Sequence, residues 1–193
     1  MQKSRVLWQN VPTQTITAGG VEFAYRELGR DHPGTPVVFL IHLAAVLDNW
    51  DPRVVDGFAA SHRVITFDNR GIGASSGAPA ASIEEMAKDA ITFIKAMGLG
   101  QVDLFGFSMG GMIAQEIVLM EPQLVRRMIL AGTGPAGGRG IEKVTRITYL
   151  DTARGLLTRQ DPKQFLFFTR TPNGRRAGKE FLARLEELSL IHI

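Results

Sequence analysis

A serine flanked by glycines is the clearest candidate for chemistry in the sequence. Residues 102–107 are mostly apolar, and Gly106-Phe107-Ser108-Met109-Gly110 follows the pattern Gly-x-Ser-x-Gly. An apolar-periodic segment from Met109 to Met120 comes directly afterwards. A strand, a sharp turn and a helix in this order hold a serine in a strained backbone conformation and lift its hydroxyl clear of a sheet. We therefore predict that Ser108 is a nucleophile.

Steric crowding explains why this motif needs glycine at two positions. A Cβ atom at Gly106 or Gly110 would collide with the neighbouring strand or helix. The N-terminus of the following helix offers free N–H groups and the positive end of its dipole to a developing anion. The alternative interpretation is an ordinary glycine-rich turn between a strand and a helix.

The composition limits the class of protein. The 193 residues are 45% hydrophobic and 21% charged, which is typical of one soluble globular domain or slightly more. The net charge of +3 comes without a basic run, so no nucleic acid partner is indicated. The absence of cysteine excludes disulfides, thiolate catalysis and thiolate metal sites. Neither a secretory signal nor a run of the ~20 apolar residues that span a membrane is found, so we expect a cytoplasmic enzyme without a membrane partner.

Alternation of strands and helices predicts the fold. We expect strands over Thr13–Ala18, Val21–Leu28, Pro36–Ile41, Arg63–Phe67, Val102–Phe107 and Arg126–Ala131. We expect helices from Pro52 to about Ala60, from Ser82 to about Met97 and from Met109 to Met120. The order β-β-β-α-β-α-β-α-β favours an α/β fold with a mostly parallel, doubly wound sheet.

The caps of these helices can also be assigned. Asp51 precedes Pro52 and is the expected N-cap of the first helix. Ser82 with Glu85 three residues later forms a capping box, and Gly98 is the expected C-terminal cap.

The strand ends sort the polar residues into two groups. In such sheets ligands bind beyond the carboxyl ends of the strands. Four polar residues follow strands and should lie at this active edge: His42, Asp68, Ser108 and Thr133. His32 and His62 precede strands and should lie at the opposite edge.

The character of the chain changes after residue 134. A linker over Gly134–Gly140 precedes helical patterns over 141–157, 162–168 and 178–187, with many basic residues and the aromatics Phe165, Phe167 and Phe168. We expect an α/β core over residues 1–135 and the start of a helical cap over 136–187.

Three motifs in order resemble the α/β-hydrolase superfamily, specifically its esterase, lactonase and cofactor-free haloperoxidase branch. His42 closes a strand where the family usually has His-Gly. Asp68-Asn69-Arg70-Gly71-Ile72-Gly73-Ala74-Ser75 is similar to its Asp-x-Arg-Gly-x-Gly-x-Ser loop, and Gly106–Gly111 looks like its nucleophile elbow. The resemblance implies a serine hydrolase that acts on a small-molecule ester or a related carbonyl compound, with no metal or organic cofactor.

The resemblance also implies an oxyanion hole made of two backbone N–H groups. One is that of Met109, and the other is that of Ala44, with Leu43 as the second choice. Leu43 stands where glycine is usual in the family. Trp50 is expected either to pack this loop or to be a plain core aromatic residue.

The family's triad acid and histidine are expected after residue 187, so neither is assigned in this chain. In the family the histidine at position 42 is structural, and a role of His42 as the base is the alternative, because it lies at the same edge as Ser108. Asp68 and Arg70 are interpreted as organisers of their own loop. Without its base the serine is a weak nucleophile, so we expect little activity from this chain as written.

The last six residues, 188–193, break the preceding polar pattern and read as the translation of a sequencing adapter. We therefore predict a non-native tail, a truncated hydrolase, and a His192 that is not catalytic. An uncovered sheet edge and core face would then cause weak folding or association.

Two alternatives to an enzyme with a serine nucleophile stay open. Gly132-Thr133-Gly134-Pro135-Ala136-Gly137 fits the dinucleotide pattern Gly-x-Gly-x-x-Gly, and Asp151 follows 19 residues after Gly132. Pro135 and the late position in the chain speak against this interpretation. The other alternative is a non-catalytic hydrolase-fold protein that binds a ligand or a partner.

Overall fold

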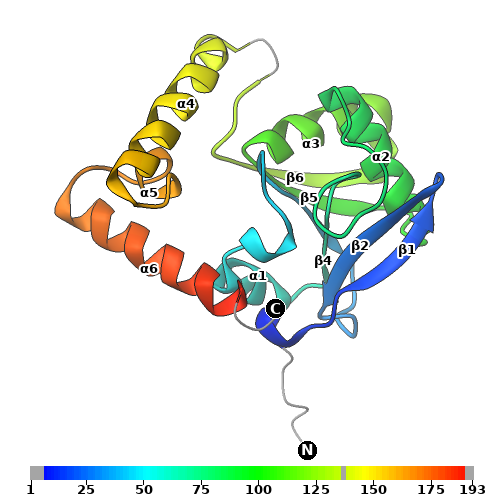
Figure 1. Ribbon diagram of the computed structural model, residues 1–193. Coiled ribbons are helices and arrows are strands. Elements are labelled where there is room, and N and C mark those ends of the chain that lie inside the picture. The colour runs from blue at the N-terminus through cyan, green and yellow to red at the C-terminus, as the bar shows by residue number, and fades with distance from the viewer. Residues whose placement is uncertain (1–6, 136–137, 190–193) are drawn as a thin grey trace, which may run out of the picture. The chain divides into compact units, whose positions relative to one another are not determined.

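The structure is a computed structural model that describes residues 7–135 and 138–189. The chain divides into two compact units, residues 1–135 and 136–193. Figure 1 shows a sheet flanked by helices in the first unit and helices alone in the second. No helix in the described ranges is long and apolar enough to cross a membrane.

The first unit is built on a sheet of six strands within the described residues. They are β1 (Gln14–Ala18), β2 (Val21–Leu28), β3 (Val37–Leu40), β4 (Val64–Phe67), β5 (Val102–Phe107) and β6 (Val125–Ala131), in the spatial order β1-β2-β4-β3-β5-β6. The pairs β4–β3, β3–β5 and β5–β6 are parallel, and β1–β2 and β2–β4 are antiparallel. The predicted α/β fold with a mostly parallel sheet is confirmed.

The central strands are buried because they carry almost only apolar residues. All four residues of β3 and all four of β4 are buried. The edge strand β6 differs, since Ile129 and Leu130 are 46% and 43% exposed. This edge of the sheet therefore presents apolar side chains and one row of backbone groups to its surroundings.

Three helices connect the parallel strands: α1 (Pro52–Ala59), α2 (Ile83–Ala96) and α3 (Met109–Met120). The Asp51 carboxylate caps α1 by accepting from the N–H of Arg53 at 2.9 Å. The Ser82 hydroxyl caps α2 by accepting from the N–H of Glu85 at 3.1 Å. The Glu85 carboxylate accepts from the N–H of Ala81 at 3.1 Å instead of from that of Ser82 as in the predicted capping box. These caps fix where the loops at the active edge end.

Aromatic residues fill both sides of the sheet. On one side Phe67 stacks on Phe93 of α2, with ring centroids 4.3 Å apart. On the other side Trp50 packs edge-on against Phe39 at 5.0 Å and near Phe105 at 5.8 Å. Trp50 is only 4% exposed and its ring contacts are made to strands, so the interpretation as a core aromatic residue holds.

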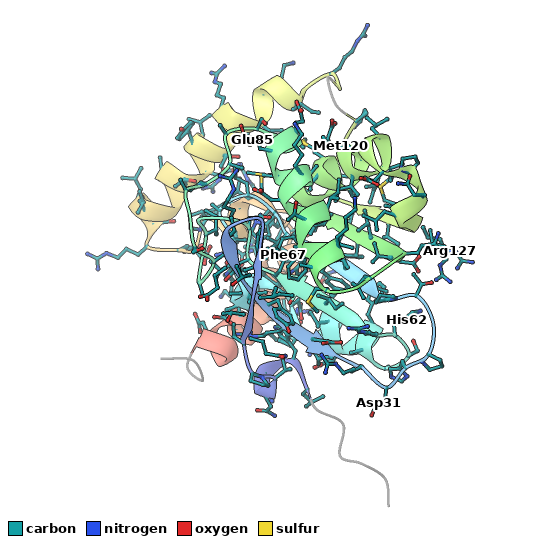
Figure 2. All side chains as sticks on the ribbon, turned by 90° about the vertical axis from the view of Figure 1, so that its right-hand side faces the viewer. Asp31, His62, Phe67, Glu85, Met120 and Arg127 are labelled. Atoms are coloured by element: carbon teal, nitrogen blue, oxygen red, sulfur yellow. The ribbon has the colours of Figure 1, made fainter. Side chains whose placement is uncertain are left out.

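Figure 2 gives the orientation of this unit. Phe67 lies in its interior, whereas Asp31 and His62 lie at the end opposite to Glu85. His32 and His62 precede β3 and β4 and are hydrogen-bonded at that far end. The imidazole of His32 bonds the carbonyl of Ala59, and that of His62 bonds the hydroxyl of Ser61.

Short 3-10 helices complete the first unit: Trp8–Asn10, Leu47–Asn49 and Pro122–Leu124. None of them was expected from the sequence, because a single turn carries too few residues to show a period.

The second unit contains α4 (Ile141–Thr158), α5 (Lys163–Leu166) and α6 (Pro172–Ser189). The expected helix over 178–187 starts six residues earlier than the sequence predicted. The Thr171 hydroxyl accepts from the N–H of Gly174 at 3.1 Å, and Pro172 opens the helix. This threonine-proline start is a regular helix signal that apolar periodicity alone does not reveal. Of the predicted tail, residues 188 and 189 belong to α6, and 190–193 with His192 lie outside the described residues.

Candidate active site

Ser108 occupies the turn between β5 and α3. Its backbone angles are φ 53° and ψ −116°, which a residue with a Cβ atom rarely adopts. Its N–H donates to the carbonyl of Ala131 at 2.9 Å, and its carbonyl accepts from the N–H of Gly111 at 2.9 Å. The Ser108 side chain forms no capping bond to α3. The hydroxyl is therefore not used to hold the turn.

Close packing of glycines makes this turn possible. A Cβ atom on Gly106 would lie 2.6 Å from the carbonyl oxygen of Gly110 and from the Cα of Gly111. A Cβ atom on Gly110 would overlap the backbone carbonyl of Leu40 at the end of β3. The prediction that both positions need glycine for space is confirmed. The contact also brings the N-terminus of α3 against the end of β3.

The loop after β3 lies beside Ser108. Strands β3 and β5 pair in parallel with Leu40 opposite Gly106, so the residues that follow them leave the sheet at the same edge. Residues 42–50 follow β3 and are called the oxyanion loop after the role that the family resemblance implies for Leu43 and Ala44. Leu43 and Ala44 are exposed at its tip, and Ala44 has a φ of 55°. Met109 is the first residue of α3, and its N–H has no partner within the helix.

A carboxylate of the next strand anchors the oxyanion loop. Asp68 follows β4 and is 3% exposed. Its Oδ1 accepts from the N–H of Leu47 at 2.8 Å, and its Oδ2 accepts from the N–H of Ala74 at 3.0 Å. Asp68 therefore joins two loops of the active edge. Burial raises the pKa of Asp68, and the two N–H donors oppose that rise.

A buried arginine provides a second anchor. Arg26 of β2 is 3% exposed, and its guanidinium forms an ion pair with Asp48 of the oxyanion loop at 2.8 Å. The same guanidinium donates to the Thr13 hydroxyl at 2.9 Å and lies over the Trp8 ring, 4.9 Å from its centroid. Within the loop itself, the Asn49 side-chain oxygen accepts from the N–H of Val46 at 2.9 Å. None of these anchors was predicted from the sequence.

The glycine-rich loop that begins at Asp68 is held in place by hydrogen bonds and close packing. The Ser75 hydroxyl donates to the carbonyl of Asp68 at 2.8 Å and accepts from the N–H of Ala24 at 2.9 Å. Gly73, with a φ of 58°, lies directly against the Asp68 carboxylate, so a Cβ atom has no room there. The interpretation of Asp68 as an organiser of this loop agrees with these contacts.

Arg70 makes contacts of the same kind. Its guanidinium donates to the carboxylates of Asp89 at 2.7 Å and Glu85 at 3.4 Å, and to the carbonyl of Ala78 at 3.1 Å. The ion pair with Asp89 raises the pKa of Arg70 further. Arg70 thus ties its loop to α2, as the sequence interpretation held.

His42 begins the oxyanion loop and is 7% exposed. Its Nδ1 lies 2.8 Å from the carbonyl oxygen of Leu43, which requires the proton on Nδ1. Its ring meets the edge of Phe107 with centroids 5.3 Å apart. In the part of the chain that the structure describes, no histidine is hydrogen-bonded to the Ser108 hydroxyl.

Thr133, the fourth polar residue expected at the active edge, follows β6. Its side chain packs against Gly111 of α3, where a Cβ atom on the glycine would collide with it. Gln115 of α3 donates from its amide to the carbonyls of Gly111 at 3.0 Å and Gly134 at 3.1 Å. The segment after β6 is therefore fixed against α3.

The dinucleotide alternative lacks its structural context. A fingerprint of this kind requires a helix that starts within the glycine-rich loop and a second strand that ends near the acidic residue. Asp151 instead lies within α4, which begins only at Ile141, and residues 136–137 of the motif lie outside the described residues.

A family comparison agrees with this geometry. The model of the alpha/beta hydrolase fold family matches residues 35–175, which is more than half of the chain. The chain therefore belongs to the α/β hydrolase family.

Individual relatives lie within the same family. The chain is 37% identical over 114 residues to BpoC of Mycobacterium tuberculosis (strain ATCC 25618 / H37Rv), a candidate non-heme bromoperoxidase. The match covers 58% of this chain and 42% of that protein. RutD of Azorhizobium caulinodans, a candidate carbamate hydrolase, is 33% identical over 107 residues, covering 54% and 40%. The chain thus spans less than half the length of these relatives.

Solved structures show the same architecture. An α/β hydrolase fold protein from Chitinophaga pinensis superposes with a TM-score of 0.83 at 34% identity, covering 95% of this chain and 65% of that one. Est816, described as an N-acyl homoserine lactone degrading enzyme, superposes with a TM-score of 0.65 at 25% identity, covering 91% and 65%.

Proposed function

We propose that the protein is a serine hydrolase in which Ser108 attacks the carbonyl carbon of a small-molecule ester or a related substrate. The observation that carries the proposal is the backbone conformation of Ser108, at φ 53° and ψ −116° between two glycines that have no room for a Cβ atom. Strain of this kind persists only where the surrounding structure imposes it, and it is concentrated at functional sites.

The chemistry that this geometry supports is acyl transfer. Ser108 Oγ attacks the carbonyl carbon while a general base removes the hydroxyl proton. The negative charge that develops on the carbonyl oxygen is stabilised by the N–H groups of Met109 and Ala44, with Leu43 as the second candidate. Collapse of this intermediate expels the alcohol with a proton and leaves an acyl-enzyme, which water then hydrolyses. The base and the acid that orients it are proposed to follow residue 187.

The relatives support a carbonyl substrate of modest size. The names of RutD and Est816 refer to a carbamate and to an N-acyl homoserine lactone. Both compounds contain a carbonyl carbon that bears a second oxygen. We infer that the substrate of this protein shares that group.

A fluorophosphonate probe tests the nucleophile directly. The 193-residue chain and the product of the complete coding sequence are treated side by side, and the modified residue is identified by mass spectrometry. We expect the longer protein to be labelled at Ser108 faster than the short one, and Ser108→Ala to abolish labelling in both. Ser61→Ala is the matched control, because Ser61 bonds a histidine at 2.8 Å but lies at the far end of the sheet.

A non-catalytic binding protein is the second candidate, and one observation favours it. Among the described residues, no hydrogen bond joins an imidazole to the Ser108 hydroxyl. If the complete protein is not labelled, or if Ser108→Ala is labelled as fast as the unmodified protein, the nucleophile proposal is wrong and the binding role gains support.

A further inference from the structure

The second unit contains a hollow of its own. A cavity of about 520 Å³ lies among α4, α5 and α6, and every residue that lines it falls between 154 and 186. Its volume is in the range of small-molecule sites in proteins. The proposed nucleophile does not belong to it.

One side of the cavity is cationic. Arg170, Arg175 and Lys179 line it, and all three are exposed. Arg175 and Lys179 are four residues apart on α6 and so share a helix face. The guanidinium of Arg175 donates to the carbonyl of Arg170 at 2.7 Å, which holds it at this rim. Among the residues that the structure describes, none of these cations is paired with a carboxylate, so an anion placed here would relieve their repulsion.

The carboxylates of the wall do not neutralise this group. Asp161 accepts from the N–H of Lys163 at 2.8 Å and forms an ion pair with its ammonium at 3.3 Å. Glu186 is seven residues beyond Lys179 on α6, which is about 10 Å along the helix axis.

The other side of the cavity is apolar. Phe165, Phe168 and Leu182 line it and are half-buried. The guanidinium of Arg154 lies over the Phe165 ring at 4.6 Å, and Phe168 packs against Phe181 at 5.5 Å. These contacts hold an aromatic wall opposite the charged rim. They also account for the basic and aromatic character that the sequence shows after residue 134.

A buried amide adds a polar group to the lining. Gln164 is 8% exposed, and within the described part of the chain neither its amide oxygen nor its amide nitrogen has a hydrogen-bond partner. The amide rests against Gly178, where a Cβ atom would leave it no space. A buried polar group without a partner is costly, and a ligand that brings a polar group into the cavity would reduce that cost.

We propose that this cavity binds a small amphipathic carboxylate. The apolar part of the ligand packs against Phe165, Phe168 and Leu182. Its carboxylate lies between Arg175 and Lys179, since guanidinium groups bind carboxylates with paired hydrogen bonds. The site is independent of the proposed reaction at Ser108, so the two proposals can fail separately.

Isothermal titration calorimetry on the full chain tests the ligand class. The probes are 4-phenylbutyrate, its neutral amide and inorganic phosphate. We expect the carboxylate to bind at least about tenfold more tightly than the amide, and its affinity to fall with added salt. Phosphate alone should give no saturable binding, because it lacks the apolar part. Equal binding of the amide, or no binding of the carboxylate at millimolar concentration, would overturn the proposal.

Matched variants locate the site. Arg175→Gln should weaken 4-phenylbutyrate binding about fivefold to tenfold. Arg176→Gln, the neighbouring cation that does not line the cavity, should leave it unchanged, as should Ser108→Ala. Circular dichroism checks that each variant is folded. If Arg175→Gln does not fold, Lys179→Gln is used in its place, with Lys143→Gln as its control. If the lining variant and its control lose affinity for 4-phenylbutyrate equally, the binding is non-specific charge attraction and the proposal is wrong.

Discussion

Two neighbouring segments of the active edge are held in place by opposite means. The elbow, residues 106–111, is fixed by the absence of side chains, because Gly106 and Gly110 bring backbone against backbone. The oxyanion loop, residues 42–50, is fixed by side chains, because the carboxylate of Asp68 and the guanidinium of Arg26 hold it from β4 and β2. A segment held by its own glycines can be identified from a short sequence pattern. A segment held by distant side chains cannot.

The largest effect is expected at the elbow. Gly110→Ala places a Cβ atom on the carbonyl of Leu40, which is backbone and cannot turn away. We expect the free energy of unfolding to fall by more than about 3 kcal/mol, measured by urea denaturation. Gly57→Ala is the control, because Gly57 lies in α1 with open space around it. That variant should be neutral or more stable by about 0.5 kcal/mol. If both variants behave alike, the elbow is not held by close packing.

The next effect concerns the anchor of the oxyanion loop. Asp68→Ala leaves the N–H groups of Leu47 and Ala74 without their acceptors in a buried place. We expect a loss of about 2–3 kcal/mol in unfolding free energy, together with slower labelling of Ser108 by a fluorophosphonate. Asp51→Ala, which removes the side-chain cap of α1, should cost about 1 kcal/mol and should leave the labelling rate unchanged. Equal labelling rates in both variants would show that the loop does not depend on Asp68.

Asp68 and Glu27 are buried acids whose contributions to the unfolding free energy should change with pH in opposite directions. Burial raises the pKa of Asp68 above its ordinary 3.8, so the native state holds that proton more tightly than the unfolded state. Stability that depends on protonated Asp68 is therefore lost as the pH rises from 3.8 through the raised native pKa.

Glu27 behaves in the reverse sense. Burial acts to raise its pKa, but the hydrogen bonds and charges of Arg30 and Arg63 outweigh burial and lower the pKa below its ordinary 4.5. Its contribution to stability is present above pH 4.5 and is lost as the pH falls through the lowered native pKa. The test is urea denaturation from about pH 3 to about pH 7. The unfolding free energy of the unmodified protein minus that of Asp68→Asn should fall as the pH rises. The same difference taken with Glu27→Gln should increase as the pH rises. Curves that run in parallel would contradict these assignments.

The smallest effect is expected at the tip of the oxyanion loop. Ala44 holds a φ of 55°, which costs a residue with a Cβ atom about 1 kcal/mol. Ala44→Gly should therefore raise the unfolding free energy by up to about 1 kcal/mol. Leu43 has no positive φ, so Leu43→Gly should lower the unfolding free energy by about 0.5 kcal/mol. If Leu43→Gly stabilises the protein, the assignment of the backbone strain to Ala44 is wrong.

The order of elements and the elbow could be predicted from the sequence because their causes are local. The run of residues 102–111 contains both the strand and the glycines that allow the turn at Ser108. The cap of α2 is equally local, since Ser82 and Glu85 are one turn apart. Patterns of this kind need no knowledge of which strands become neighbours.

The anchors of the oxyanion loop could not be predicted, because they join residues far apart in the chain. Asp68 and Leu47 are 21 positions apart, and they meet only because β3 and β4 pair in parallel. The ion pair between Arg26 and Asp48 needs the antiparallel pairing of β2 with β4 as well. The early start of α6 is a different case, since Thr171-Pro172 is a local signal that periodicity does not register.

The open edge of β6 has a consequence for handling the protein. Ile129 and Leu130 are partly exposed on the last strand of the sheet, beside backbone groups that another strand could pair with. Pairing of two such edges is a bimolecular event. Loss of monomer through this edge would therefore follow second-order kinetics, and dilution would protect the protein.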